Sequence, residues 1–449
     1  MVMPMAVAAI DVRYSTEMNR LFDEEARLVK WLQVEGALAW AQGQLGLIPP
    51  EAAREIVRKA STRFVKLERV KEIEKKIDHD LMAAVRALAD ACRGNAGGYV
   101  HLGATSYDIE DTATALTFID ALGLIEKRVR RLRDLLARLA LKHKRTVCIG
   151  RTHGQHAVPT TYGMKFALWA SELDRHLLRL GQARERIAVG KMSGAVGTMA
   201  TFGPRAFELQ QLVMKRLGLK PAPITNQIVQ RDRHAEVLFV LALIACTLDK
   251  MGREIRNLQR TEIMELAEPM KKGQVGSSTM PQKRNPHRSE RICSLARVLR
   301  SHLSVALENI PLEHERDLTN SASERVVFAE AFILADYMLK EMLEIIDGLD
   351  MFPDNIERNL TLNRGLVMAE RLMVALANKG MSRQDAHELL RRASARAFRA
   401  KKHLREELLE DRDVRRYLTK GDLEEIFDEH TYIGKAPEIV ERAVKGMRA

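Results

Sequence analysis

Apolar residues recur at helical spacing along most of the chain, and no stretch shows the strict alternation of a strand. Within residues 234–266, for example, Leu238, Leu241 and Ala245 follow one another at spacings of three and four. Runs of this kind predict five long helices, at residues 108–144, 160–188, 234–266, 285–308 and 323–349. Gly123 interrupts the first of them, at a cost of about 1 kcal/mol that a long packed helix tolerates. The pattern therefore predicts an all-α protein with a central bundle of long helices.

Shorter helical runs flank this bundle on both sides. The first set ends at residues 93–98, where three glycines interrupt the pattern, and Pro353 opens the second set. A chain of 449 residues is too long for one ordinary core. We therefore predict three helical domains, at residues 1–106, 107–350 and 351–449.

The formal charge of +12 can reflect a nucleic-acid partner, an acidic small substrate or a surface rich in lysine and arginine. Aromatic residues make up 5% of the chain, and no stretch interleaves them with basic residues. That pattern argues against the stacking platforms that bind single-stranded nucleic acid. We therefore expect no nucleic-acid partner, and instead a small substrate that carries carboxylate and phosphate groups.

The cysteines and the apolar runs indicate the cellular compartment in which we expect the protein. Cys92, Cys148, Cys246 and Cys293 lie far apart, which offers neither a zinc site nor a disulfide framework. Residues 1–10 are short and lack the basic flank of a signal peptide, and no later run approaches the roughly 18 apolar residues of a membrane span. We expect a cytoplasmic protein without a membrane partner.

A polar loop at residues 276–290 stands out between two helical runs. It reads Gly-Ser-Ser-Thr-Met-Pro-Gln-Lys-Arg-Asn-Pro-His-Arg-Ser-Glu, and its glycine and prolines are typical of a loop. By composition alone it is consistent with a solvated connector. Its residue sequence, however, resembles the signature loop of the fumarase/aspartase superfamily, whose motif is Gly-Ser-Ser-x-Met-Pro-x-Lys-x-Asn-Pro. Every fixed position of that motif is matched, from Gly276 to Pro286. The resemblance implies cleavage of a C–N or C–O bond by β-elimination, usually with release of fumarate.

Six further short clusters of polar residues, which we call polar islands, lie at the ends of long helices or at the start of a domain. They are Arg13–Ser15, His101–Asp108, Arg151–His156, Ser193–Thr198, Thr225–His234 and His314–Arg325. Together they resemble the adenylosuccinate lyase family, from about residue 12 to 365 and weakly through Tyr432–Pro437. The nearest alternative is the carboxymuconate cycloisomerase family, which typically lacks an island like Thr152-His153-Gly154. Gln282 and Asp78 depart from the common pattern, and an acid at position 78 puts a phosphate contact there in doubt.

Elimination of fumarate from a succinyl-amine needs a base at carbon, an acid at nitrogen and donors around the carboxylate that takes up negative charge. Lys283 and Asn285 suit the carboxylate, because one brings charge and the other directional donors. Thr105 and Ser106 can hold a second carboxylate.

The acid and the base are assigned from side-chain chemistry together with the resemblance. His153 is the candidate acid, because imidazole titrates near neutral pH, and a partner carboxylate at Glu290 would favour its charged form. The superfamily implies that Ser277 is the base, activated by nearby amide N–H groups and Lys283. Two alternatives stay open: Ser278 is the base, or Ser277 only hydrogen-bonds a carboxylate.

The resemblance also implies the residues that bind the nucleotide and the leaving group. They are Arg13, Tyr14, His79, Asp80, His101, Gln227, Arg316, Ser321 and Arg325. Arginine suits phosphate because its planar fork binds two oxygens at once. No metal or other cofactor is expected. The implied reactions convert adenylosuccinate to AMP and the succinylcarboxamide ribotide SAICAR to AICAR, each with release of fumarate. A cycloisomerase and a catalytically silent structural relative are the alternative functions.

The spacing of the islands predicts that one chain does not hold a complete site. Thr105 and His153 lie at opposite ends of the helix predicted at residues 108–144, which would be roughly 54 Å long. Unless that helix folds back at Gly123, the two residues need different chains to meet on one substrate. The family implies a homotetramer whose core is the long-helix bundle and whose sites are each assembled from three subunits.

Overall fold

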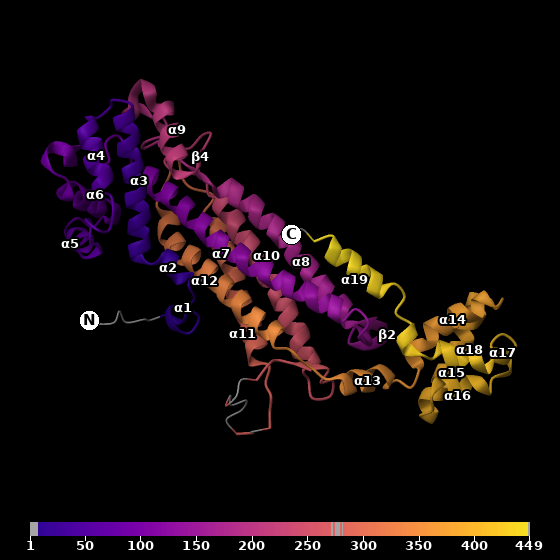
Figure 1. The fold of residues 1–449 in the computed structure, drawn as a ribbon. Helices are drawn as coiled ribbons and strands as arrows, with labels where there is room; N and C mark the ends of the chain where they lie inside the picture. The colour runs from indigo at the N-terminus through magenta and orange to yellow at the C-terminus, as the bar shows by residue number, and fades with distance from the viewer. Residues whose placement is uncertain (1–7, 271–272, 274–278, 281, 448–449) are drawn as a thin grey trace. The chain divides into compact units, whose positions relative to one another are not determined.

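The computed structural model of the protein describes residues 8–270, 273, 279–280 and 282–447 (Figure 1). The described part consists mainly of helices, which confirms the all-α prediction. It falls into two compact units, which we call the first unit and the second unit. The first unit comprises residues 1–129, 175–248 and 294–341, and the second comprises residues 130–174, 249–293 and 342–449. The three domains predicted from the sequence stay a prediction.

Five long helices each contribute residues to both units. They are α7 (Ser106–Lys142), α8 (Tyr162–Ile187), α10 (Asp232–Leu258), α11 (His287–Glu308) and α12 (Thr319–Asp347). The five predicted long helices are therefore present, and α7 continues through Gly123. The third ends eight residues earlier than predicted, because Glu265 N–H bonds Leu258 O at 2.9 Å and closes a turn there. None of the described helices has the length and apolarity needed to cross a lipid bilayer.

The first unit also contains the short helices that precede α7, together with α9 (Ala206–Leu217). These helices are α1 (Ala9–Val12), α2 (Asn19–Phe22), α3 (Glu24–Gln44), α4 (Pro50–Lys59), α5 (Leu67–Ile77), α6 (Asp80–Ala91) and the 3₁₀ helix η1 (Gly94–Tyr99). The apolar faces of α3, α4, α5, α6 and α9 share one core, in which Leu209 and Val213 of α9 pack with residues of α3 (Figure 1). The helical pattern that runs from residue 16 to 45 is broken at Asp23, whose side chain accepts a bond from Ala26 N at 2.7 Å and caps α3.

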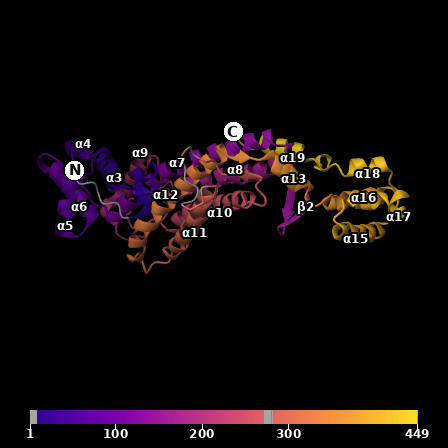
Figure 2. The same cartoon turned by 90° about the horizontal axis from the view of Figure 1, so that it is seen from below.

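The second unit contains the short helices near the C-terminus, and Figure 2 shows the helices of residues 383–426 close together. The short helices are α13 (Pro353–Thr361), η3 (Leu366–Met368), α14 (Ala369–Asn378), α15 (Arg383–Ala400), α16 (Leu404–Leu409), α17 (Arg412–Arg415), α18 (Lys420–Ile426), η4 (Glu429–Thr431) and α19 (Ala436–Lys445). Leu372, Leu390 and Leu423 belong to their common core. Ser382 caps α15, because its hydroxyl accepts a bond from Asp385 N at 3.1 Å.

The sequence pattern did not predict the strands of the structure. The longest pair is an antiparallel hairpin, formed by β1 (Val147–Thr152) and β2 (Gln155–Thr161). Val147 and Ile149 of β1 join the core of the C-terminal helices, so the hairpin is anchored at its base. Two shorter pairs join β3 (Val189–Gly190) to β4 (Lys220–Pro221) and β5 (Leu266–Ala267) to β6 (Asp350–Met351).

Candidate active site

A cleft of about 480 Å³ in the first unit brings together most of the predicted binding residues. We call it the first-unit cleft. It is lined by His79, Asp80, Thr105, Ser106, Gln227, Arg316, Ser321 and Arg325, together with Glu74, Asp78, Tyr107, Glu110 and Leu318. The predicted residues come from the starts of α6, α7 and α12 and from the loops before α10 and α12. Residues that are more than 200 positions apart in the sequence therefore share one cleft, and Asp78 lies among them.

Arg316 is the cation in this cleft that is best placed to receive an anion. Its Nη1 donates to Gln227 Oε1 at 3.0 Å, and its guanidinium carbon lies 3.5 Å from the centroid of the Tyr107 ring. Among the described residues its buried Nε and Nη2 atoms have no hydrogen-bond partner. A buried guanidinium with unused donors is costly, so this arrangement suits a ligand that supplies oxygen acceptors.

The opposite wall of the first-unit cleft holds an ion pair. Arg325 Nη2 donates to Asp80 Oδ2 at 2.7 Å. Burial opposes ionisation of Asp80, but the hydrogen bond and charge of Arg325 outweigh it and lower the pKa of that carboxyl. His79 caps α6 by accepting a bond from Met82 N at its Nδ1, at 3.3 Å, so the neutral ring carries its hydrogen on Nε2.

Tyr107 is a member of the cleft that the sequence did not single out as a binding residue. Its hydroxyl donates to Ser321 Oγ at 3.4 Å. Burial raises the pKa of Tyr107 to about 12, so the hydroxyl stays a neutral donor at physiological pH. The ring of Tyr107 and its hydroxyl thus connect α7 to both Arg316 and Ser321.

Glu110 is a second lining residue that sequence reasoning missed. It stands one turn into α7, where a glutamate in a helical run is usually a solvated residue. Burial, followed by repulsion from the Asp80 carboxylate, raises the pKa of Glu110 to about 7, although the charge of Arg325 acts in the opposite direction. The cleft therefore contains a carboxyl group that titrates near neutral pH.

A fully buried ion pair supports the Thr105–Ser106 end of the cleft. Asp108 Oδ1 accepts bonds from Lys191 Nζ at 2.6 Å and Ser193 N at 2.8 Å, and its Oδ2 accepts bonds from Thr105 N at 2.9 Å and Gly194 N at 3.1 Å. The Ser193–Thr198 island therefore holds the turn before α7 in place.

Three predicted binding residues of the first unit do not line this cleft. Arg13 is exposed, and Tyr14 packs edge-on against Tyr337 with 5.1 Å between ring centroids. His101 Nδ1 lies 2.6 Å from Glu35 Oε1. Burial favours the neutral ring, but the Glu35 carboxylate outweighs it and raises the pKa of His101. Their predicted roles stay predictions.

The second unit holds the described part of the signature loop. Lys283, Asn285 and Glu290 line a pocket of about 860 Å³, which we call the second-unit pocket, and Arg253, Arg256 and Arg260 also line it. Arg256 Nη2 lies 4.0 Å from Glu290 Oε1. This set of cations suits an acidic ligand. The two candidate bases, Ser277 and Ser278, lie outside the described residues.

Buried polar groups fix the end of the signature loop. Glu268 accepts bonds from the backbone N–H groups of Arg288, at 3.2 Å, and Ser289, in the first turn of α11. Gln259 Oε1 accepts a bond from Glu268 N at 2.9 Å, and Gln259 Nε2 donates to Arg284 O at 3.0 Å. The segment that carries Lys283 and Asn285 is thus attached to α11 and to the end of α10.

His153 lies at the turn of the β1–β2 hairpin and is exposed. His153 and Gly154 both have left-handed backbones, with φ of 53° and 74°, as a two-residue type I′ turn requires. Near the hairpin base, buried Glu265 accepts bonds from Arg151, from Tyr162 Oη at 2.6 Å and from Asn359 Nδ2 at 3.0 Å. Within the described chain no bond joins His153 to Glu290, so their pairing stays a prediction.

The first-unit cleft and the second-unit pocket both hold cations that suit an acidic ligand. Among the described residues, no three His, Cys, Asp or Glu side chains are grouped to hold a metal ion.

Residues 12–300 match the family model described as lyase, and residues 365–443 match the one described as adenylosuccinate lyase C-terminus. The fold and the matched residues thus define a lyase.

Full-length relatives specify the family. The adenylosuccinate lyase of Pyrococcus horikoshii is 59% identical over 442 residues, which cover 98% of each chain. That of Methanocaldococcus jannaschii is 54% identical over 448 residues, which cover 99% of this chain and 96% of the relative. The chain belongs to the adenylosuccinate lyase family of the fumarase/aspartase superfamily.

Solved structures of the superfamily share the fold. A fumarate lyase from a Mesorhizobium species has a TM-score of 0.89 at 34% identity, covering 99% of this chain and 100% of its own. A β-carboxy-cis,cis-muconate cycloisomerase from Acinetobacter calcoaceticus also has a TM-score of 0.89, at 29% identity, covering 97% and 99%. Fold alone therefore does not separate the two activities, whereas the match to the adenylosuccinate lyase C-terminus does favour the lyase.

Proposed function

We propose that the protein cleaves adenylosuccinate to AMP and fumarate, and SAICAR to AICAR and fumarate, in purine nucleotide synthesis. The observation that carries this proposal is the first-unit cleft, where Arg316 offers unpaired donors beside Gln227, Ser321 and Arg325. A nucleotide monophosphate supplies oxygen acceptors that match such a cleft. A cycloisomerase acting on a small carboxylate has no need for this set.

The proposed chemistry is a β-elimination under general acid–base catalysis. Ser277 removes a proton from the carbon beside a succinyl carboxylate, and Lys283 and Asn285 stabilise the negative charge that develops there. The electron pair forms the carbon–carbon double bond of fumarate, and the bond from carbon to nitrogen breaks. His153 gives a proton to the departing nitrogen, with Glu290 as the carboxylate that supports its charged form.

We further propose that the complete site forms only in a homotetramer, as the resemblance to the family implies. Gln227, Arg316 and Ser321 line the first-unit cleft, while His153, Lys283 and Asn285 belong to the second unit. In the proposed tetramer the cleft residues, His153 and the signature loop that carries Lys283 and Asn285 come from three different chains. A cytoplasmic location also remains a proposal from the sequence.

Fumarate release tests the proposed activity. The purified protein should release one fumarate for each adenylosuccinate consumed, and should do the same with SAICAR. The cycloisomerase substrate, a carboxymuconate, serves as the matched comparison. Conversion of the carboxymuconate without any fumarate from adenylosuccinate would show that the alternative activity is the true one.

Glu110 should make nucleotide binding depend on pH. Below its pKa of about 7 the carboxyl is neutral, and above it the carboxylate adds a negative charge to the cleft that would hold the phosphate. Like charges a few ångströms apart repel by about 1 kcal/mol in a solvated setting, so AMP affinity should fall roughly three- to tenfold as the pH rises from 6 to 8.

The control for this titration is Glu110→Gln, which keeps the size of the side chain and removes its charge. The phosphate of AMP also titrates near pH 6, so its contribution appears in both proteins. Calorimetric titration with AMP at each pH gives the two curves. Parallel curves for the wild type and Glu110→Gln would show that Glu110 does not face the bound nucleotide.

A further inference from the structure

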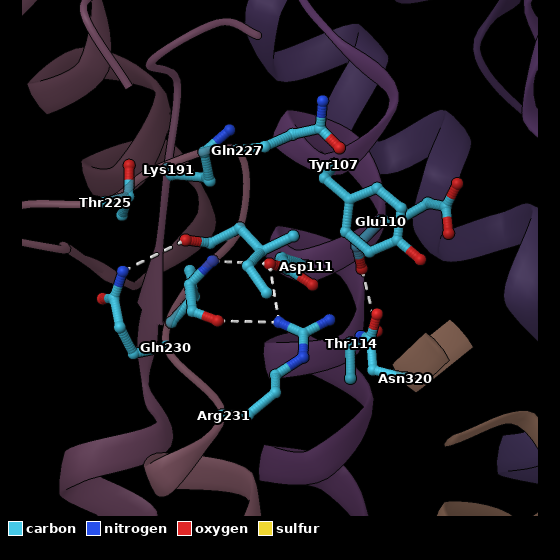
Figure 3. Close-up of polar contacts among 12 residues, drawn as sticks. Tyr107, Glu110, Asp111, Thr114, Lys191, Thr225, Gln227, Gln230, Arg231 and Asn320 are labelled. Atoms are coloured by element: carbon cyan, nitrogen blue, oxygen red, sulfur yellow. Dashed lines mark hydrogen bonds and ion pairs between the residues drawn. The ribbon is translucent and has the colours of Figure 1, made fainter. Parts of the chain in front are cut away.

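The Gln230–His234 motif has no assigned role in binding or catalysis, yet it contains one of the most buried arginines of the first unit. Arg231 retains 3% of its surface. Its Nε and Nη2 donate to the two carboxylate oxygens of Glu324, at 2.8 and 3.1 Å. Its Nη1 donates to Asp111 Oδ2 at 2.9 Å (Figure 3). Nη1 also donates to Val229 O at 2.8 Å.

We call these four residues, Arg231, Asp111, Glu324 and Val229, the Arg231 cluster. The cluster joins three segments of the chain, and each segment carries a residue of the first-unit cleft. Asp111 stands one helical turn after Tyr107 on α7. Val229 lies two residues after Gln227, and both of its backbone polar groups are bound, because Val229 N donates to Asp111 Oδ2 at 2.7 Å. The third segment is the start of α12, which carries Glu324.

The third segment is tied to the cluster twice. Asn320 Nδ2 donates to Glu324 Oε1 at 2.9 Å, and Asn320 immediately precedes Ser321. The guanidinium carbon of Arg231 also lies 5.8 Å from the centroid of the Tyr107 ring, the same ring that Arg316 contacts. Figure 3 shows Arg231 and Asp111 in the same group of residues as Tyr107 and Gln227 of the cleft.

The charges of the cluster explain why it holds one geometry. Burial opposes ionisation of Asp111, but the charge of Arg231 outweighs it and lowers the pKa of that carboxyl. A planar guanidinium binds one carboxylate with two donors and a second carboxylate with another, which fixes the angle between its partners. Loss of Arg231 would leave Asp111 and Glu324 buried without a counter-charge.

We propose that Arg231 is a positioning residue for nucleotide binding, because its guanidinium sets the spacing between Tyr107, Gln227 and Ser321. The inference rests on the proposed function, and assigns the Gln230–His234 motif a role in the ground-state binding of the nucleotide. Arg231 itself need not touch the substrate. Its effect passes through the three segments that it holds together.

The split between KM and kcat distinguishes this role from simple stabilisation of the fold. A variant that only unfolds in part loses active molecules, so its apparent kcat falls while KM and AMP affinity of the remaining enzyme are unchanged. A variant whose cleft residues are displaced loses the same binding energy in the ground state and in the transition state. Its KM and its Kd for AMP therefore rise together, while kcat changes little. We expect Arg231→Met to raise both by at least tenfold and to change kcat by less than about fivefold.

Two further variants should raise KM and the Kd of AMP by smaller amounts. Arg231→Lys keeps the charge but cannot make the two-donor bond to Glu324 and the bond to Asp111 at once, so it should recover part of the lost affinity. Glu324→Gln removes one charge and keeps the shape of its side chain. It should raise KM at least threefold, and it serves as the test if Arg231→Met does not fold.

Asp336→Asn is the matched control. Asp336 is fully buried on α12 and accepts a bond from Arg128 Nε of α7 at 2.9 Å, so this pair joins the same two helices. It lies 15 residues beyond Ser321, or about 22 Å along α12. Asp336→Asn should lower the melting temperature and leave KM and the Kd of AMP within twofold of wild type.

The results separate this inference from the proposed function. Wild-type protein that releases no fumarate from adenylosuccinate would contradict the function. A wild type that releases fumarate, together with Arg231→Met or Glu324→Gln variants that lose stability like Asp336→Asn but keep KM and the Kd of AMP, would contradict the positioning role alone. Higher KM and Kd in the Arg231 and Glu324 variants, with partial recovery in Arg231→Lys, would support it.

Discussion

Replacement of His153 by asparagine should lower the turnover of adenylosuccinate by two orders of magnitude or more while the protein stays folded. Loss of a general acid typically costs about 10²–10⁴-fold in rate. Asparagine is well suited to this position, because His153 occupies the first position of a type I′ turn, with φ of 53°, before Gly154. The variant thus removes the imidazole ring without straining the hairpin.

Turnover and the melting temperature should be measured together for this variant. His387→Asn, on the exposed face of α15 in the same unit, is the matched control and should keep wild-type turnover. Turnover above a tenth of the wild-type value in a folded His153→Asn protein would mean that another group protonates the leaving nitrogen.

The same turnover assay with Ser277→Ala and Ser278→Ala should show a comparable loss of turnover for Ser277→Ala alone. This result would choose between the two candidate bases.

The long helices were predictable from the sequence because each buries an apolar stripe over many turns. The β1–β2 hairpin was not, because its strands are only six and seven residues long and lie between two long helical runs. Its strongest local signal is the His153–Gly154 pair, and glycine favours the left-handed conformation that this turn needs. A histidine in the first position is a weaker turn signal than asparagine or aspartate.

The members of the first-unit cleft were predictable where they stand at helix ends, as Thr105, Gln227 and Ser321 do. Glu110 of the cleft and Asp111 of the Arg231 cluster were not, because they lie inside a helical run, where acidic residues usually face solvent. Their roles follow from contacts with residues far away in the sequence, such as Arg231 with Asp111 and Glu324. A single sequence carries no signal for such pairs.

A mixture of two inactive variants should recover activity if the proposed site is shared between chains. Thr105 immediately precedes α7, and the hairpin that carries His153 follows it. The helix between them in the sequence is continuous over 37 residues, which corresponds to about 55 Å. Elimination needs the binding cleft and the acid within a few ångströms of one substrate. Antiparallel association of identical chains brings opposite helix ends together.

One variant should carry Thr105→Ala together with Arg316→Ala, and the other should carry His153→Asn. Each variant alone should be inactive at low substrate concentration. The two are dissociated together, reassociated in equal amounts and assayed for fumarate release, and mass spectrometry of the intact oligomers establishes mixing. Separately treated and then combined proteins are the control.

The recovered activity of this mixed oligomer tests the shared site most directly. If the two lesions belong to different chains of each site, random assembly makes both positions intact in about a quarter of the sites, and the mixture should approach a quarter of wild-type activity. If one chain supplied both positions, every site would keep a lesion. A demonstrably mixed oligomer without activity would contradict the proposal that the two units of different chains complete the active site.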